Sequence, residues 1–253
     1  MRDLATSSVG LVVSTALLTV AVVGSGGDLQ PSAQRVLAAA VPGLLAVLFR
    51  PVLYPTASWR RHAGVIAAWA LVVATVALLT GLVLAPDLAW RTLRPLLATV
   101  ACLLVLILPV LTLATLLDVL SAGASRVSRS AAGEASAWCL TALLVLLASA
   151  PLWLGPAAEL ALPERPGVSE AVLAASPLSP LAVSAGNDLL RNQWFYQRAN
   201  LASLPVAYGR PAATLAVGLA AFAVLLVLLA QVAGPGVRRQ AAMEPPRPGE
   251  PRP

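Results

Sequence analysis

Hydrophobic residues run along this chain in long stretches and do not alternate with polar ones. Five stretches without a charged side chain are 23 to 27 residues long: Leu4 to Gly27, Ala63 to Pro86, Pro95 to Leu117, Ala135 to Ala158 and Pro211 to Val237. A helix needs about 20 apolar residues to cross a hydrocarbon core of about 30 Å. Each of these stretches therefore predicts a transmembrane helix.

A shorter stretch lies between Arg35 and Arg50. It holds 14 uncharged residues and contains Pro42-Gly43, and runs of this length are often re-entrant or interfacial. Arginine side chains near helix ends can, however, extend to the lipid headgroups. We expect Arg35 and Arg50 to do so, and we predict a sixth span over about residues 33–54.

The distribution of arginine favours an even number of spans. With six spans, ten arginines fall on the side of the two termini, and three lie in the opposite short loops: Arg35, Arg91 and Arg94. Four more lie in the long loop between the fifth and sixth spans, and long loops contribute little to this bias. Because basic residues mark cytoplasmic loops, we predict a multi-pass protein of the cytoplasmic membrane with both termini in the cytoplasm.

The first span has an alternative interpretation as a cleaved signal peptide. Its apolar stretch, Val9 to Val23, is followed by small residues, as in such signals. Asp3 offsets the charge of Arg2, so the positive segment expected before the apolar stretch is weak. We favour an uncleaved span.

Composition agrees with this pattern. The chain is 58% hydrophobic and 11% charged, whereas soluble proteins have about 25% charged residues. We predict an all-α, polytopic helical bundle with an amphipathic helical segment outside the membrane between the fifth and sixth spans. The transmembrane domain covers 1–237, with spans at about 4–27, 33–54, 63–86, 95–117, 135–158 and 211–237, an external segment at 157–210, and a disordered cytoplasmic tail at 238–253.

The rare residues argue against an enzyme. A single histidine, His62, cannot form a His-rich metal site, and no GxxxxGKS or GxGxxG run is present. Cys102 and Cys139 lie inside apolar runs and are interpreted as small core residues, since a disulfide requires their helices to lie side by side. We expect no catalytic residues, metal, cofactor or nucleic-acid partner.

Hydroxyl groups dominate the polar side chains inside the spans. They belong to Ser14, Thr15, Thr19, Thr75, Thr80, Thr112, Thr115, Thr141 and Ser149, and we expect them to bond to their own helices. No ionised side chain is expected at mid-membrane depth, and Asp118 falls at the end of a span. This pattern disfavours an ion channel and an ion-coupled transporter, which place charges in the membrane.

The external segment predicts a helix that lies at, or dips into, the outer surface. Ser179-Pro180 is a favourable start for a helix, and apolar spacing extends it to about Arg198. Beyond its middle stand Arg191 and the triplet Trp194, Phe195 and Tyr196. The triplet predicts either an external gate that contacts a hydrophobic substrate or an interfacial anchor.

The layout resembles the membrane subunits of type 2 ABC exporters over about residues 35 to 237. Their proline-led stretch before the last span is similar to Ser179-Pro180-Leu181 through Asp188-Leu189-Leu190-Arg191. The resemblance implies that Phe49 to His62 forms a coupling loop for a separate ATPase subunit. Its implied contacts are Trp59, Arg60 and Arg61, although the same arginine pair also fits an ordinary cytoplasmic anchor.

Two functions follow from these patterns. One is an ABC-type permease subunit, acting as a homodimer or heterodimer with a separate ATPase, that moves a hydrophobic or lipid-like substrate outward. The other is a non-transporting membrane scaffold or assembly subunit that presents its external segment to a partner. In both, the lipid bilayer surrounds the protein.

Overall fold

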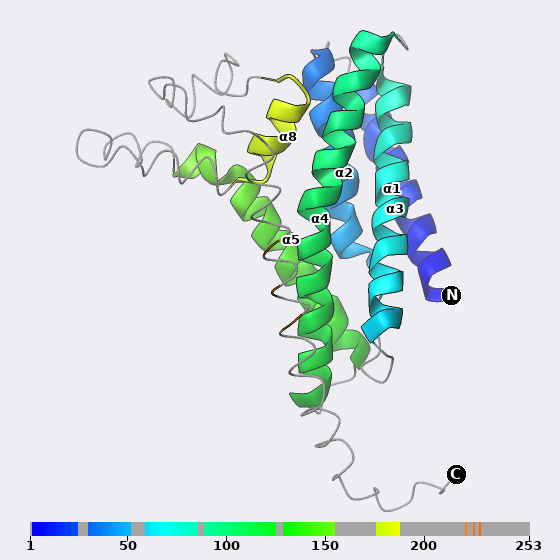
Figure 1. Ribbon diagram of the computed structural model, residues 1–253, viewed down its shortest axis with the longest axis vertical. Coiled ribbons are helices and arrows are strands. Elements are labelled where there is room, and N and C mark those ends of the chain that lie inside the picture. Colours follow the sequence, from blue (N-terminus) through cyan, green and yellow to red (C-terminus); the bar gives the residue numbers. More distant parts are fainter. Residues whose placement is uncertain are drawn as a thin grey trace, which may run out of the picture.

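The computed structural model describes residues 2–24, 30–51, 59–85, 89–124, 129–154 and 176–187, together with Ala221, Leu225 and Leu228. Within these residues the structure is helical and contains no strands (Figure 1). The helices are α1 (Arg2–Gly24), α2 (Pro31–Leu48), α3 (Trp59–Leu84), α4 (Trp90–Ala124), α5 (Arg129–Trp153) and α8 (Leu178–Ser184). The predicted all-α class is confirmed for this part of the chain.

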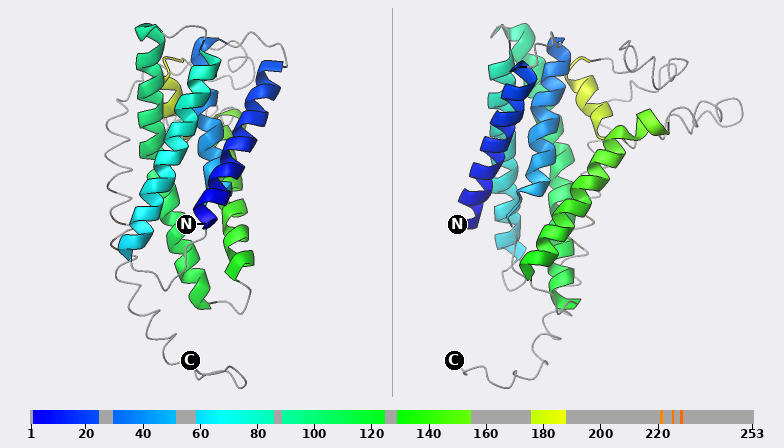
Figure 2. Two further views of the ribbon diagram at one scale, coloured as in Figure 1. Left: turned by 90° about the vertical axis from the view of Figure 1, so that its right-hand side faces the viewer. Right: turned by 180° about the vertical axis from the view of Figure 1, so that it is seen from behind.

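The five long helices run alternately up and down, as the views in Figures 1 and 2 show. In the orientation of Figure 1, α1, α3 and α5 run upward and α2 and α4 run downward, and α2 ends above the end of α4. Contacts join α1, α2, α3 and α4 into one packed group, and α5 joins it through α2 and α4. Toward the upper end α5 leans away from α4 (Figure 1).

All five long helices are long and apolar enough to cross a membrane. α2, the shortest, has 18 residues, or about 27 Å at 1.5 Å per residue, and continues through Pro42-Gly43. The predicted second span therefore forms a helix of membrane length, which ends at Leu48. The predicted sixth span, 211–237, lies outside the described residues except for Ala221, Leu225 and Leu228, which are helical.

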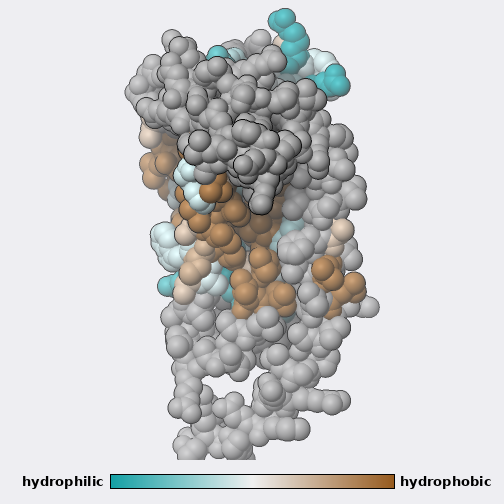
Figure 3. All heavy atoms as spheres, turned by 90° about the vertical axis from the view of Figure 1, so that its left-hand side faces the viewer, coloured by the Kyte–Doolittle hydropathy of each residue, from teal (hydrophilic) through white to brown (hydrophobic). Residues whose placement is uncertain are grey.

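Large hydrophobic side chains cover the outside of the bundle. Val83 of α3 is 76% exposed, and Leu17 of α1 is 66% exposed. Figure 3 shows hydrophobic residues gathered over the middle of the face on the side of α5. A soluble monomer rarely exposes apolar patches beyond a few hundred Å². This surface is compatible with an integral membrane protein.

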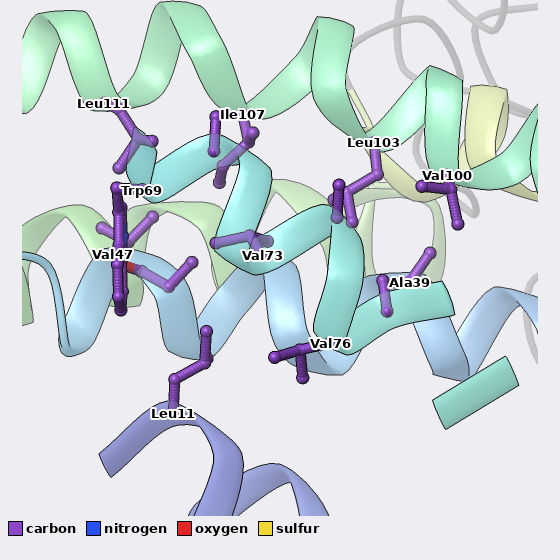
Figure 4. Packing of buried hydrophobic residues seen from close by; sticks show 14 of the residues in the cluster. Leu11, Ala39, Val47, Trp69, Val73, Val76, Val100, Leu103, Ile107 and Leu111 are labelled. Atoms are coloured by element: carbon purple, nitrogen blue, oxygen red, sulfur yellow. The ribbon is translucent and has the colours of Figure 1, made fainter. Parts of the chain in front are cut away.

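Small residues bring the helices close together inside the bundle. Ala39 and Ala46 of α2 and Ala77 of α3 are buried, and such residues let helix backbones approach one another. A Cβ atom added at Gly43 of α2 would lie 2.7 Å from Leu103 Cδ1 of α4. Figure 4 shows that larger core residues of the four helices α1, α2, α3 and α4, including Trp69, point into one cluster. The helices therefore pack through short side chains at their closest contacts.

Most of the hydroxyl groups expected to bond within their own helices do so. Donors to the carbonyl four residues earlier are Thr19, Thr75, Thr112, Thr115, Thr141 and Ser149. Thr15 Oγ1 is an exception, because it is buried and makes no hydrogen bond to a described residue. These hydroxyl groups therefore have hydrogen-bond partners within their own helices.

α8 enters the bundle from the connection between α5 and the predicted sixth span. It contacts α2 and α4, Leu181 and Ala182 are fully buried, and Ser176 Oγ before it donates to the carbonyl of Ala148 in α5 at 3.1 Å. α8 thus lies beside α4 and α2 and is linked to α5, near the upper end (Figure 2). Residues 176–187 therefore pack against the bundle, and the location of this segment at the outer membrane surface stays a prediction.

The predicted helix from Pro180 to about Arg198 is wrong in its extent. α8 ends at Ser184, and Gly186 adopts a φ of 70°. The Asn187 N–H donates to the carbonyl of Ala182, and the Gly186 N–H donates to that of Val183, which is the pattern of a Schellman motif. This motif closes the helix after two turns.

Candidate functional site

A buried ion pair joins three helices in the lower half of the bundle. Arg50 follows the end of α2 by two residues, Asp118 belongs to α4 and Ser136 to α5. Arg50 is 7% exposed and Asp118 is 5% exposed. We call Arg50, Asp118 and Ser136 the ion-pair site.

Hydrogen bonds connect all three residues of the ion-pair site. Arg50 donates through Nη1 to Asp118 Oδ2 and through Nη2 to Asp118 Oδ1 at 2.8 Å. Nη2 also donates to Ser136 Oγ at 2.7 Å, and the Ser136 hydroxyl donates to Asp118 Oδ1 at 3.0 Å. Two-point contact between a guanidinium and a carboxylate fixes orientation as well as distance. The site therefore fixes the end of α2 against both α4 and α5.

The site lies inside the bundle and not at its rim. Asp118 stands six residues before the end of α4, which corresponds to about 9 Å along the helix. An unpaired charge at such a place costs several kcal/mol, and removing one partner of a buried pair costs about 3–5 kcal/mol. Arg50 and Asp118 thus depend on each other to remain in the bundle.

Trp69 of α3 holds the last turn of α2 next to the ion-pair site. Its indole N–H donates to the carbonyl of Ala46 at 3.0 Å. The last four carbonyls of a helix have no partner within the helix, so the indole satisfies one of them. Pro51, directly after Arg50, is also buried. The start of the connection between α2 and α3 therefore lies within the packed part of the molecule.

A small hollow adjoins this end of α2. It is lined by Arg50, Pro51, Val65, Ile66, Trp69, Leu111 and Thr115 and has room for about one water molecule. Arg50 Nε makes no hydrogen bond to a described residue and is shielded from solvent. One N–H of the guanidinium is therefore unsatisfied while the other nitrogens are paired.

One expectation about charge is corrected here. Arg50 does not extend to the headgroups, because its side chain turns inward to Asp118. Asp118 itself ends the apolar part of α4 that is long enough to cross a membrane, where the sequence placed it. The sequence held a usable signal, since α2 and α4 run in the same direction and carry opposite charges near their ends. The pairing of Arg50 with Asp118 can be predicted only when the opposite charges and the common direction of α2 and α4 are used together.

The residues of the predicted coupling loop lie at the lower end, the same end as the ion-pair site. Trp59 and Arg60 begin α3, and Arg61 follows with an exposed side chain. Residues 52–58 of that loop lie outside the described residues. The coupling role of Trp59, Arg60 and Arg61 stays a prediction.

The predicted external gate or anchor lies outside the described residues. It comprises Arg191, Trp194, Phe195 and Tyr196. The described part of this external segment, residues 176–187, contacts α2. Arg35 Nε of α2 donates a hydrogen bond to the carbonyl of Ala185 at 3.0 Å. Arg35 thus bonds the turn that ends α8.

The two cysteines are separate from each other. Cys102 of α4 and Cys139 of α5 are both free thiols, and Cys102 lies near the side chain of Ser184 in α8. Cys139 is exposed on α5. Cys102 therefore contacts α8, and the two thiols do not form a disulfide.

Comparison of the chain with protein-family models, with curated proteins and with solved structures found no match. The fold and the ion-pair site define the class at a coarse level, as a multi-helix protein compatible with integral membrane insertion.

Proposed function

We propose that this chain is the permease subunit of an ABC-type export system that moves a hydrophobic or lipid-like substrate. A separate ATPase subunit would supply the energy, and the permease would act as a homodimer or heterodimer. The observation that carries the proposal is α8, a seven-residue helix that packs against α2 and α4 and ends at the left-handed Gly186.

The physical support comes from where α8 lies. Helices too short to cross a membrane are tolerated at membrane depth only where protein buries them or where they line a cavity. Transporters use such broken helices along substrate pathways. In α8, Ser179, Pro180 and Leu181 are buried, and these residues begin the stretch that resembles the proline-led motif of type 2 ABC exporters. A scaffold that only presents an external segment does not require this insertion.

The positive charge at the start of α3 also supports the proposal, because it offers a contact for an ATPase subunit. Arg60 and Arg61 lie in the first turn of α3, and the exposed side chain of Arg61 is accessible to a partner. Arg91 and Arg94 lie in the first turn of α4 at the upper end and are also exposed. Exposed arginines thus lie at both ends of the bundle, and we assign ATPase contact to Arg60 and Arg61 at the lower end.

The test is purification of the tagged full chain in mild detergent from its own cells. We expect an ATPase subunit to co-purify, and we expect Arg60→Gln with Arg61→Gln to lose it while membrane insertion and topology are kept. The matched control is Arg91→Gln with Arg94→Gln, which should retain the ATPase. Recovery of the intact chain without any ATPase would contradict the proposal and favour the scaffold function.

A further inference from the structure

We propose that the ion-pair site is a two-state switch for the start of the connection between α2 and α3. In the closed state Arg50 pairs with Asp118 inside the bundle, as in this structure. In the open state the pair is broken and Arg50 lies at the lower end of the bundle, so that Pro51 becomes accessible to water. This inference does not rest on the proposed transport function.

The backbone at Arg50 lies outside α2. That helix ends at Leu48, and Phe49 supplies the last backbone bond by donating to the carbonyl of Leu45. Pro51 has no backbone N–H. The position of Arg50 therefore depends mainly on its side-chain bonds to Asp118 and Ser136, and these bonds can break without unwinding a helix.

The closed state is favoured by direct bonds and opposed by the loss of water. Desolvation of a buried pair offsets much of its electrostatic attraction, and Arg50 Nε is left without a hydrogen bond to a described residue. In the open state the long arginine side chain reaches water and headgroups, a distance of about 9 Å from the level of Asp118 to the end of α4. Two positions of similar free energy are the condition for a switch.

Ser136 makes the closed state depend on α5 as well as on α4. Its hydroxyl both accepts from Arg50 and donates to Asp118. A movement of the lower part of α5 away from α4 would remove this bridge and weaken the pair. The switch thus links the position of α5 to the position of Arg50 and Pro51.

The experiment measures water access to Pro51 in the full chain. Pro51→Cys is introduced with Cys102→Ser and Cys139→Ser, which leaves one thiol, because the chain has two cysteines. In lipid nanodiscs, we measure the rate at which a membrane-impermeant maleimide labels this thiol. Asp118→Asn should raise the rate by about tenfold or more, and Ser136→Ala by about threefold to tenfold, since its two hydrogen bonds to Arg50 and Asp118 are lost.

Two further variants separate the switch from general damage. Glu134→Gln removes an exposed carboxylate two residues from Ser136 and should leave the rate unchanged. Arg50→Gln with Asp118→Asn removes both charges and should restore slow labelling, because no unpaired charge remains to be expelled. If Asp118→Asn does not fold, Ser136→Ala alone decides.

Results that overturn the switch are equally defined. Folded Asp118→Asn protein that is labelled at the parent rate would contradict it. So would a doubly neutral variant that is labelled as fast as Asp118→Asn, since the charge of Arg50 would then not drive the opening. Where Ser136→Ala has to decide, labelling at the parent rate contradicts the switch.

Discussion

Trp69 and Arg50 act on the same terminus of α2 by different means. The indole N–H of Trp69 bonds the carbonyl of Ala46, and the guanidinium of Arg50 reaches Asp118 and Ser136. Both side chains are buried, and each bridges from one helix to another. At the residue scale, directed polar bonds fix where α2 ends, within surroundings of alanine, valine and leucine.

Trp69→Phe should destabilise the protein, because it removes the N–H and leaves the carbonyl of Ala46 without this partner. A hydrogen bond inside a membrane protein contributes about 0.6 kcal/mol on average, and an unsatisfied buried group adds to the loss, so we expect about 1–2 kcal/mol. The measurement is reversible unfolding by SDS in mixed micelles. Trp138→Phe, at an exposed position of α5, is the control and should change the unfolding free energy little.

Asp118→Asn should lower the free energy of unfolding by up to about 3 kcal/mol, because it removes the charge partner of Arg50, and release of Arg50 to the lower end limits the loss. Arg50→Gln with Asp118→Asn should recover part of this loss. The same SDS titration measures both. Equal stability of Asp118→Asn and the parent protein would show that the pair contributes nothing to the fold.

At the scale of elements, close contacts decide how the helices fit. Gly81 of α3 lies against Leu96 of α4, where an added Cβ atom would collide with the leucine side chain, whereas Gly64 of the same helix has nothing near its Cβ position. Leu96 is itself buried and has little room to move. α3 therefore carries one glycine that packing requires and one that it does not.

Gly81→Ala and Gly64→Ala should have opposite effects. Overpacking costs about 1–3 kcal/mol, so Gly81→Ala should destabilise the bundle. Gly64→Ala should be neutral or stabilising, by up to about 1 kcal/mol, since alanine is the better helix former. Thermal unfolding of the two purified variants compares them directly, and a stabilised Gly81→Ala protein would contradict the tight contact of α3 with α4.

The short helix α8 depends on its C-terminal turn. Gly186→Ala places a Cβ atom in the left-handed region, which costs about 1–2 kcal/mol, and should loosen α8. Cys102 reports on this, because it lies near Ser184 of α8. A membrane-permeant maleimide should label Cys102 faster in Gly186→Ala, while labelling of Cys139 on α5 stays constant. An unchanged rate at Cys102 would show that α8 does not depend on this turn.

The sequence was a good guide to elements whose signal is local. Apolar length predicted α1, α3, α4 and α5, and it also indicated α2 despite Pro42-Gly43. A local signal also marks the end of α8, because Gly186-Asn187 favours the end of a helix. The apolar spacing that follows it favours a longer helix, to about Arg198, and is misleading there. The pairing of Arg50 with Asp118 was missed because it joins residues far apart in the chain, and single-residue patterns favour the lipid headgroups for an arginine at a helix end.

At the scale of the whole molecule, the bundle is apolar on its outside and closely packed within. Val83, Leu17 and Trp138 face outward, while alanines fill the helix contacts. Only lipid or another apolar partner satisfies such a surface. The five described helices of membrane length alternate in direction, so the side reached by the C-terminus depends on the predicted sixth span.

The most direct test of this account is the side of the membrane on which each terminus lies. Single cysteines at Asp3 and at Pro253, in chains with Cys102→Ser and Cys139→Ser, are exposed to a membrane-impermeant maleimide in intact and in opened cells. We predict that both are protected in intact cells and labelled after opening, as six spans with cytoplasmic termini require. Labelling of one terminus alone in intact cells would contradict the account.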